Sequence, residues 1–261
     1  MYADLVKWDV IERFQEFLDG GGMQIAQDGR LDYRLKIDHN SPWIHHTSDE
    51  SMYCMLFHLI HRVTGHIHER CMNCWKVVCR LPTVMDLLAM EQIQAGGEYE
   101  AKCGMEMRPT VEGHFGSYWY CGSREEGLGR LDTVRGIVKE LPTSIPENDV
   151  WLKRYCTEFE LAGGPTDEYV RPPEYDVWQK IFEEIFVWHK PQHRQPEYLK
   201  RHIRRRWIEF ASDRADPTVR LLNDNQPLHR GVVRYERDTD RATEIRVRDE
   251  MPVRPEAVGA R

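Results

Sequence analysis

Apolar residues recur at helical spacing over residues 6–18, which predicts an amphipathic helix that ends at the glycines of residues 20–22. Alternating apolar and polar positions follow, and they predict a hairpin over residues 23–37 with its turn at Asp28-Gly29. A capping box of Thr47 and Glu50 then predicts a helix that continues to about residue 63, just before Gly65.

The middle of the chain carries the most regular pattern. Helices are predicted after Thr83 and after Ser123, each with an acidic residue placed to cap its first turn. The predicted strands around them are residues 75–80, 99–107, 117–121 and 150–156. The resulting order is β-α-β-β-α-β, which is typical of a ferredoxin-like domain. We therefore predict an α+β protein with a central ferredoxin-like domain.

Changes in this pattern divide the chain into four predicted segments. Residues 1–70 hold the N-terminal helix, the β-hairpin and a His-rich helix, and residues 71–162 form the ferredoxin-like, metal-binding domain. Residues 163–222 carry two apolar stripes at helical spacing, so they predict a helical segment. Residues 223–261 mix charged residues with few large apolar ones, which is typical of an extended arm or a disordered tail.

Composition narrows the class of protein. A chain of 261 residues with 41% apolar and 30% charged residues can build a core, and its net charge of -7 argues against wholesale coating of nucleic acid. No run approaches the length of a membrane span, and the N-terminus lacks the pattern of a secretory signal. Seven cysteines in this setting indicate reduced thiols or metal ligands. We expect a cytoplasmic protein in a reducing compartment, or part of an intracellular assembly, with no membrane contact.

A C-x2-C knuckle, Cys71 and Cys74, lies just before the first strand of the predicted central domain. We expect the first and third strands to run parallel in the centre, with the second and fourth antiparallel at the edges. The knuckle then lies beside the end of the fourth strand, where Cys156 is found, and Cys103 lies late in the second strand. The sequence therefore predicts a metal site of Cys71, Cys74, Cys103 and Cys156.

Four thiolates suit either a [4Fe–4S] cluster or a tetrahedral zinc ion. A zinc ribbon contains two C-x2-C pairs, whereas Cys103 and Cys156 are single cysteines far apart in the sequence. This difference favours the cluster. A second ligand set stays open, because Cys54, His58 and His61 share one helix face and His66 and His68 precede the knuckle. Two histidines with the knuckle would resemble a Cys2His2 zinc centre, while half-buried or solvated histidines are the ordinary alternative.

Two other residue pairs carry side chains with possible chemistry. Cys79 and Cys121 end the two central strands, and we expect them at the opposite edge as small buried side chains. Glu158 and Glu160 follow Cys156, and strand alternation would put both carboxylates on one face as acid and base, or simply in solvent.

A basic helix face offers a different chemistry. It consists of Lys200, Arg201, Arg204 and Arg205, which lie opposite an apolar stripe. Such a face can contact nucleic-acid phosphates, although basic helix faces often pair with carboxylates of the same protein.

Three functions are consistent with these patterns. The first is a metal-stapled structural or interaction protein that acts in a larger assembly, with a protein partner or as an oligomer. The second is an iron–sulfur or zinc enzyme with a nearby Glu or His for proton transfer, although no catalytic residue can be named. The third is a nucleic-acid-binding regulator that uses the basic helix.

Overall fold

The computed structural model describes a set of residue ranges, namely 10–33, 40–46, 53–141, 143, 145–189, 195–225, 233–235 and 242–244. The chain divides into two compact units, Met1–Asp216 and Pro217–Arg261. The second unit contains the 3-10 helix η4 (Pro217–Asn223) and an antiparallel pair, β8 (Val233–Tyr235) and β9 (Ala242–Glu244). The capping box at residues 47–50 lies outside the described residues, as does the predicted strand beyond residue 33.

Residues 10–13 are helical and precede helix α2 (Gln15–Asp19) in the first unit. The predicted hairpin follows, in which β1 (Met23–Ile25) pairs with β2 (Leu31–Tyr33). Helix α3 (Cys54–Thr64) ends at Gly65, whose φ of 74° gives the left-handed cap that glycine favours. The remaining helices outside the central domain are α4 (Glu69–Met72), α7 (Thr157–Gly163), α8 (Tyr175–Ile185) and α9 (Glu197–Asp213), with 3-10 turns η2 (Glu147–Asp149) and η3 (Thr166–Glu168).

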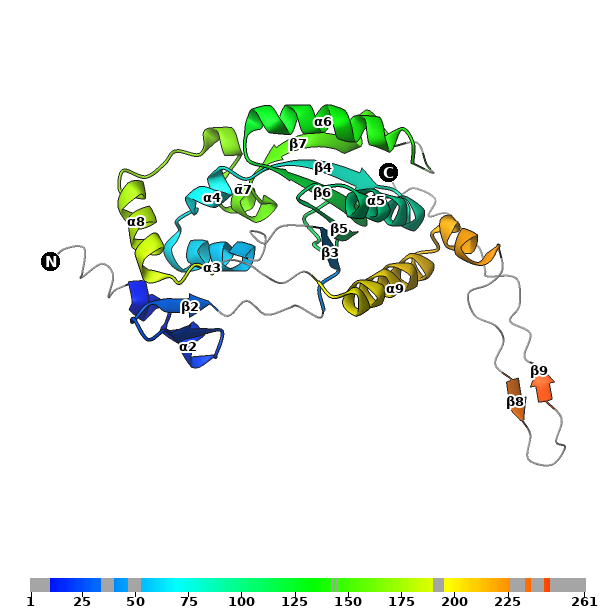
Figure 1. The fold of residues 1–261 in the computed structure, drawn as a ribbon, viewed down its shortest axis with the longest axis horizontal. Helices are drawn as coiled ribbons and strands as arrows, with labels where there is room; N and C mark the ends of the chain where they lie inside the picture. The colour runs from blue at the N-terminus through cyan, green and yellow to red at the C-terminus, as the bar shows by residue number, and fades with distance from the viewer. Residues whose placement is uncertain are drawn as a thin grey trace, which may run out of the picture. The chain divides into compact units, whose positions relative to one another are not determined.

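A five-stranded antiparallel sheet forms the centre of this unit (Figure 1). Its order is β3-β5-β6-β4-β7. The strands are β3 (Trp43–His46), β4 (Trp75–Leu81), β5 (Ala101–Met105), β6 (Phe115–Cys121) and β7 (Val150–Arg154). The predicted mixture of helix and sheet is confirmed, and the ferredoxin-like assignment stays a prediction. The sequence did not predict β3, which adds an edge strand beside β5.

Two capped helices connect the strands as the sequence predicted. Thr83 caps α5 (Val84–Gly96) because its hydroxyl accepts the Asp86 N–H at 3.2 Å. Ser123 caps α6 (Arg124–Val138) in the same way, accepting the Glu126 N–H at 3.1 Å. The Glu126 carboxylate then accepts the N–H of Gly122 at 2.8 Å, so both ends of this capping pair are used.

The register divides the sheet into two chemically different faces, because directly paired residues point the same way. One face is apolar and lies under α5 and α6; a Cβ at Gly127 of α6 would meet Leu152 of that face at 2.6 Å. The other face carries Lys76 beside Tyr120, and Tyr118 beside Lys102. Figure 1 shows α6 over β7 and β4 on one side, with α3, α4 and α7 on the other.

The expected parallel pairing of the first and third strands is wrong. β4 and β6 are antiparallel, and Trp75 at the start of β4 lies opposite Cys121 at the end of β6. The β5–β6 pair is antiparallel, so β5 runs in the same direction as β4 and begins, rather than ends, at the knuckle edge. Cys121 therefore lies at the knuckle edge, whereas Cys79 lies toward the other end of β4.

The fourth strand is shorter than predicted. It ends at Arg154, and Tyr155 has a positive φ of 34°, so the chain turns at once into α7. Cys156 is the N-cap residue of that helix rather than the last residue of a strand. Glu158 and Glu160 consequently lie on a helix, and their predicted placement on one strand face is wrong. No helix in the described ranges is long and apolar enough to cross a bilayer.

Candidate metal centre

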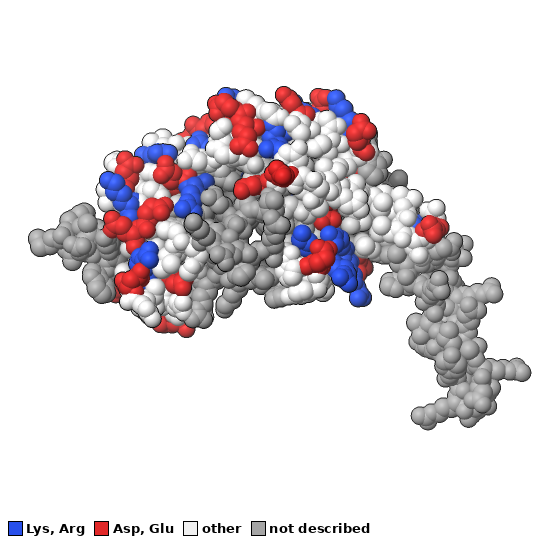
Figure 2. All heavy atoms as spheres, in the orientation of Figure 1, with Lys and Arg blue, Asp and Glu red and all other residues white. Residues whose placement is uncertain are grey.

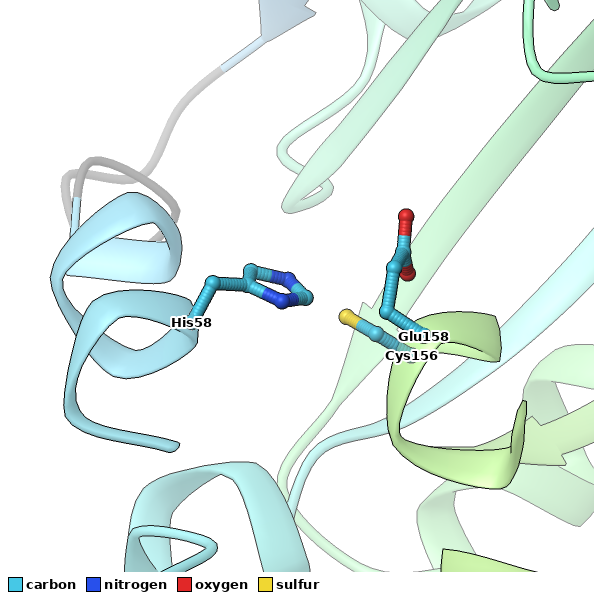
Figure 3. Close-up of side chains that lie close together, drawn as sticks. All are labelled: His58, Cys156 and Glu158. Carbon is cyan, nitrogen blue, oxygen red and sulfur yellow. The ribbon is translucent and has the colours of Figure 1, made fainter. Parts of the chain in front are cut away.

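Helices α3 and α7 bring three potential ligands together (Figure 3). Ligand atoms of His58, Cys156 and Glu158 all lie within 4.8 Å of one another. The His58 ring points from α3 toward the Cys156 sulfur, and it stacks on Phe159 of α7 with ring centroids 4.7 Å apart. The stacking fixes the side of α3 that faces α7.

The knuckle lies directly beside this group. The Cys74 N–H donates to the Cys71 carbonyl at 3.2 Å, which closes the tight turn. The Cys74 carbonyl in turn accepts the N–H of Tyr155 at 2.9 Å, one residue before Cys156. The predicted proximity of the knuckle and Cys156 therefore follows from a backbone hydrogen bond that extends the β4–β7 pairing beyond its last strand residues.

Cys54 is the thiol that the ligand prediction left out. It precedes His58 by one helical turn, so both side chains lie on the face of α3 that meets α7. Burial, together with the neighbouring thiols of Cys156 and Cys74, raises the pKa of Cys54 to about 12. Burial and the other three thiols also raise the pKa of Cys71. Four cysteines thus lie near enough to one another at this junction for their thiols to interact electrostatically, and the i, i+4 spacing of Cys54 and His58 was the sequence signal for the fourth.

Cys103 lies elsewhere, and its predicted position at the knuckle edge is wrong. It pairs with Ser117 in the middle of the sheet, on the face opposite to Lys102. Its side chain is fully buried, and burial together with the charge of Glu91 raises its pKa. Cys121 reaches the knuckle edge, where burial, the charge of Glu126 and the Cys74 thiol raise its pKa. Its side chain belongs to the apolar face with Trp119, opposite to the face of Lys76, so we leave it out of the group of four.

Two lysines from the sheet lie against the thiols. The Lys76 ammonium donates to the Cys156 sulfur at 3.7 Å. The Lys102 ammonium lies over the ring of Trp43 at 4.8 Å and over that of Tyr118 at 5.3 Å, and Lys76 approaches the same Tyr118 ring at 5.9 Å. Burial raises the pKa of Cys156, but Lys76, a hydrogen bond with His58 and Lys102 outweigh it and bring that pKa down to about 6.

Glu158 belongs to a second set of contacts beside the thiols. Its Oε1 accepts from Arg108 at 2.6 Å, and Arg108 also donates to the nearly buried Glu106, through Nε at 2.8 Å. Burial raises the pKa of Glu158, but Arg108 outweighs it and the pKa is lowered. The other oxygen, Oε2, is buried and has no hydrogen-bond partner in the described structure. One carboxylate oxygen is therefore committed to Arg108, and the other is open to a ligand.

The other histidines of the alternative ligand set bind protein groups. His66 and His68 both contact the Gln179 side chain, at 3.3 and 3.1 Å. His68 also stacks on Phe57 with centroids 4.4 Å apart, and His61 lies edge-on to Phe159. Neither His66 nor His68 joins the group within 4.8 Å.

The basic face of α9 is partly occupied by carboxylates. Arg204 donates to Glu91 at 2.8 and 3.1 Å and to Glu197 at 2.9 Å, and Arg205 donates to Glu209 at 2.9 Å. Figure 2 shows Lys and Arg side chains gathered over the start of α9, with acidic side chains beside them. Arg204 and Arg205 therefore pair with carboxylates of the same protein, which was the alternative left open by the sequence. Nucleic-acid binding stays a prediction.

Comparison with known proteins identifies no relative of this chain. No protein-family model matches the chain, and neither the curated proteins nor the solved structures give a match.

Proposed function

We propose that this chain binds a [4Fe–4S] cluster where α3, the knuckle and the start of α7 meet. The ligands in this proposal are Cys54, Cys71, Cys74 and Cys156. The observation that carries it is the convergence of four thiols from three separate segments, tied by the hydrogen bond from Tyr155 to the Cys74 carbonyl. Four soft anionic ligands are what such a cluster requires.

The spacing of the thiols favours a cluster over a single zinc ion. Tetrahedral zinc with Zn–S bonds of about 2.3 Å holds its sulfurs about 3.8 Å apart. Among the described residues, one group of three possible metal ligands has its ligand atoms within 4.8 Å of one another, and of the four thiols that group contains Cys156 alone. A four-iron cube holds its thiolates farther apart than one ion does, so it suits the wider arrangement.

The role we propose is that of a metal staple. The ligands come from α3, from the turn before β4 and from the turn after β7, which are far apart in the sequence. A cluster that joins them can bind to the folded chain but not to the unfolded chain. Its binding free energy therefore adds to the stability of the fold. Such a protein can present its helices to a partner chain in a larger assembly.

A second candidate is a mononuclear zinc site of His58, Cys156 and Glu158. Its support is the 4.8 Å group itself and the buried, unpartnered Oε2 of Glu158. Three protein ligands would leave a fourth position open, as in catalytic zinc sites. The ammonium of Lys76 beside the sulfur and Arg108 on the carboxylate both oppose a divalent cation there.

Two sets of variants separate the candidates. If the cluster is present, Cys74→Ala abolishes bound iron and sulfide, whereas His58→Gln and Glu158→Gln retain both. A zinc site gives the reverse: zinc persists in the Cys74 variant and is lost in the other two. Metal and acid-labile sulfide are measured on protein purified without oxygen. Zinc binding that survives Cys74→Ala and needs His58 refutes the cluster.

A further inference from the structure

Two lysines face the four thiols without a carboxylate to balance them. Lys76 is buried, and Lys102 is half-buried between aromatic rings. Among the described residues neither ammonium forms an ion pair with a carboxylate, and the Lys76 ammonium donates to the sulfur of Cys156 at 3.7 Å. Lys153, which is paired with Lys76 in the sheet, differs because its ammonium binds Glu160.

Buried ammonium groups require negative charge nearby, because removing an ion from water costs several kcal/mol unless a counter-charge is close. Four thiolates around a cube of mixed-valence iron leave a complex with about two negative charges in its oxidised form. Two ammonium groups balance that charge. The sheet thus supplies positive charge on the side where the proposed cluster would be negative.

We infer that Lys76 and Lys102 are charge-compensating residues that raise the reduction potential of the bound cluster. The inference rests on the proposed function. Reduction transfers one electron from an external reductant to the cluster and makes it more negative by one charge. An adjacent ammonium stabilises the reduced form more than the oxidised form, so it favours uptake of the electron.

The test is a potentiometric titration of the anaerobically purified full chain with dithionite, followed by absorbance and electron paramagnetic resonance. Lys76→Met and Lys102→Met remove each charge while keeping an unbranched side chain of similar length. At a fixed potential the ratio of reduced to oxidised cluster should fall on the order of tenfold for each change, which corresponds to about 59 mV for a one-electron couple. Lys153→Met is the matched control and should change the ratio little, because Glu160 already balances that charge.

The possible outcomes separate this inference from the proposed function. Wild-type protein without iron and sulfide overturns the function itself. A wild-type cluster whose potential is unchanged in both Lys76→Met and Lys102→Met overturns the inference alone. Should Lys76→Met fail to hold a cluster, Lys76→Arg decides: recovery of iron at the wild-type potential supports a role of charge, and equal loss in both variants refutes it.

Discussion

The pair formed by Arg204 and Glu91 links α9 to the helix that covers the apolar face of the sheet. The Glu91 side chain is 4% exposed, and Arg204 holds both of its oxygens, at 2.8 and 3.1 Å. Replacing Arg204 with Ala leaves a buried carboxylate without its cation. We expect this change to destabilise the protein more than any other single change on the basic face.

The magnitude follows from the burial of the carboxylate. Removing one partner of a buried, hydrogen-bonded ion pair lowers the free energy of unfolding by about 3–5 kcal/mol. This loss is a large part of the total stability of a typical domain. Arg205→Ala on the same helix is the matched control. Arg205 and Glu209 are 78% and 57% exposed, so their pair contributes under about 1 kcal/mol. The double variant Arg204→Met with Glu91→Gln removes both charges and should recover most of the loss.

Urea unfolding followed by circular dichroism measures these differences, and equal slopes in urea show that the same transition is compared. The reasoning is refuted if Arg204→Ala and Arg205→Ala lie within about 1 kcal/mol of each other. It also fails if the double variant is no more stable than Arg204→Ala. A nucleic-acid phosphate would have to displace Glu91 and Glu197 to reach Arg204. A strong Arg204–Glu91 pair therefore opposes the predicted contact of Arg204 with nucleic acid.

Three further changes test the fold. Burial lowers the pKa of His46 from 6.5 to about 4, so the unfolded chain binds the extra proton between these values, and His46 should cost up to about 3 kcal/mol of stability as pH drops through that window. His46→Gln should reduce the pH dependence of the urea midpoint without abolishing it, because burial also lowers the pKa of His45 and of His68 to about 3; an unchanged pH dependence contradicts this. Gly127→Ala puts a Cβ 2.6 Å from a terminal methyl of Leu152, which must shift, so the gain of about 1 kcal/mol that alanine brings inside a helix should be lost; a melting temperature raised by the full gain contradicts this packing. Asp86→Ala removes the buried acceptor of the Thr143 N–H, at 3.0 Å, and should cost about 1–3 kcal/mol in urea unfolding; wild-type stability would show that the bond is dispensable.

Local signals in the sequence predicted most helices and strands because each depends on neighbouring residues. The Ser123 and Thr83 caps and the Gly65 stop are set by hydrogen bonds and backbone angles within one turn. Strand β3 was missed because Trp43–His46 has only four residues and is held by pairing with β5, some sixty residues further along the chain. Pairing of this kind leaves little local pattern.

At the candidate site, too, the residues fixed by local sequence were predicted and those that depend on long-range packing were not. The knuckle and Cys156 were found from spacing and strand order, although Cys156 caps a helix. Cys103 was chosen because β5 was expected to finish at the knuckle edge, and strand direction is a property of the whole sheet. Cys54 was noticed on a face with His58, but which element that face meets is decided by the stacking on Phe159.

We propose that Cys54, and not Cys103, completes the four-cysteine site. The most direct measurement is iron, acid-labile sulfide and the absorption spectrum of anaerobically purified wild type, Cys54→Ala and Cys103→Ala. We predict about four iron atoms per chain and a broad band near about 400 nm that dithionite bleaches in wild type and Cys103→Ala, with both lost in Cys54→Ala. A colourless wild-type protein, or a cluster that survives Cys54→Ala and is lost in Cys103→Ala, would contradict the account.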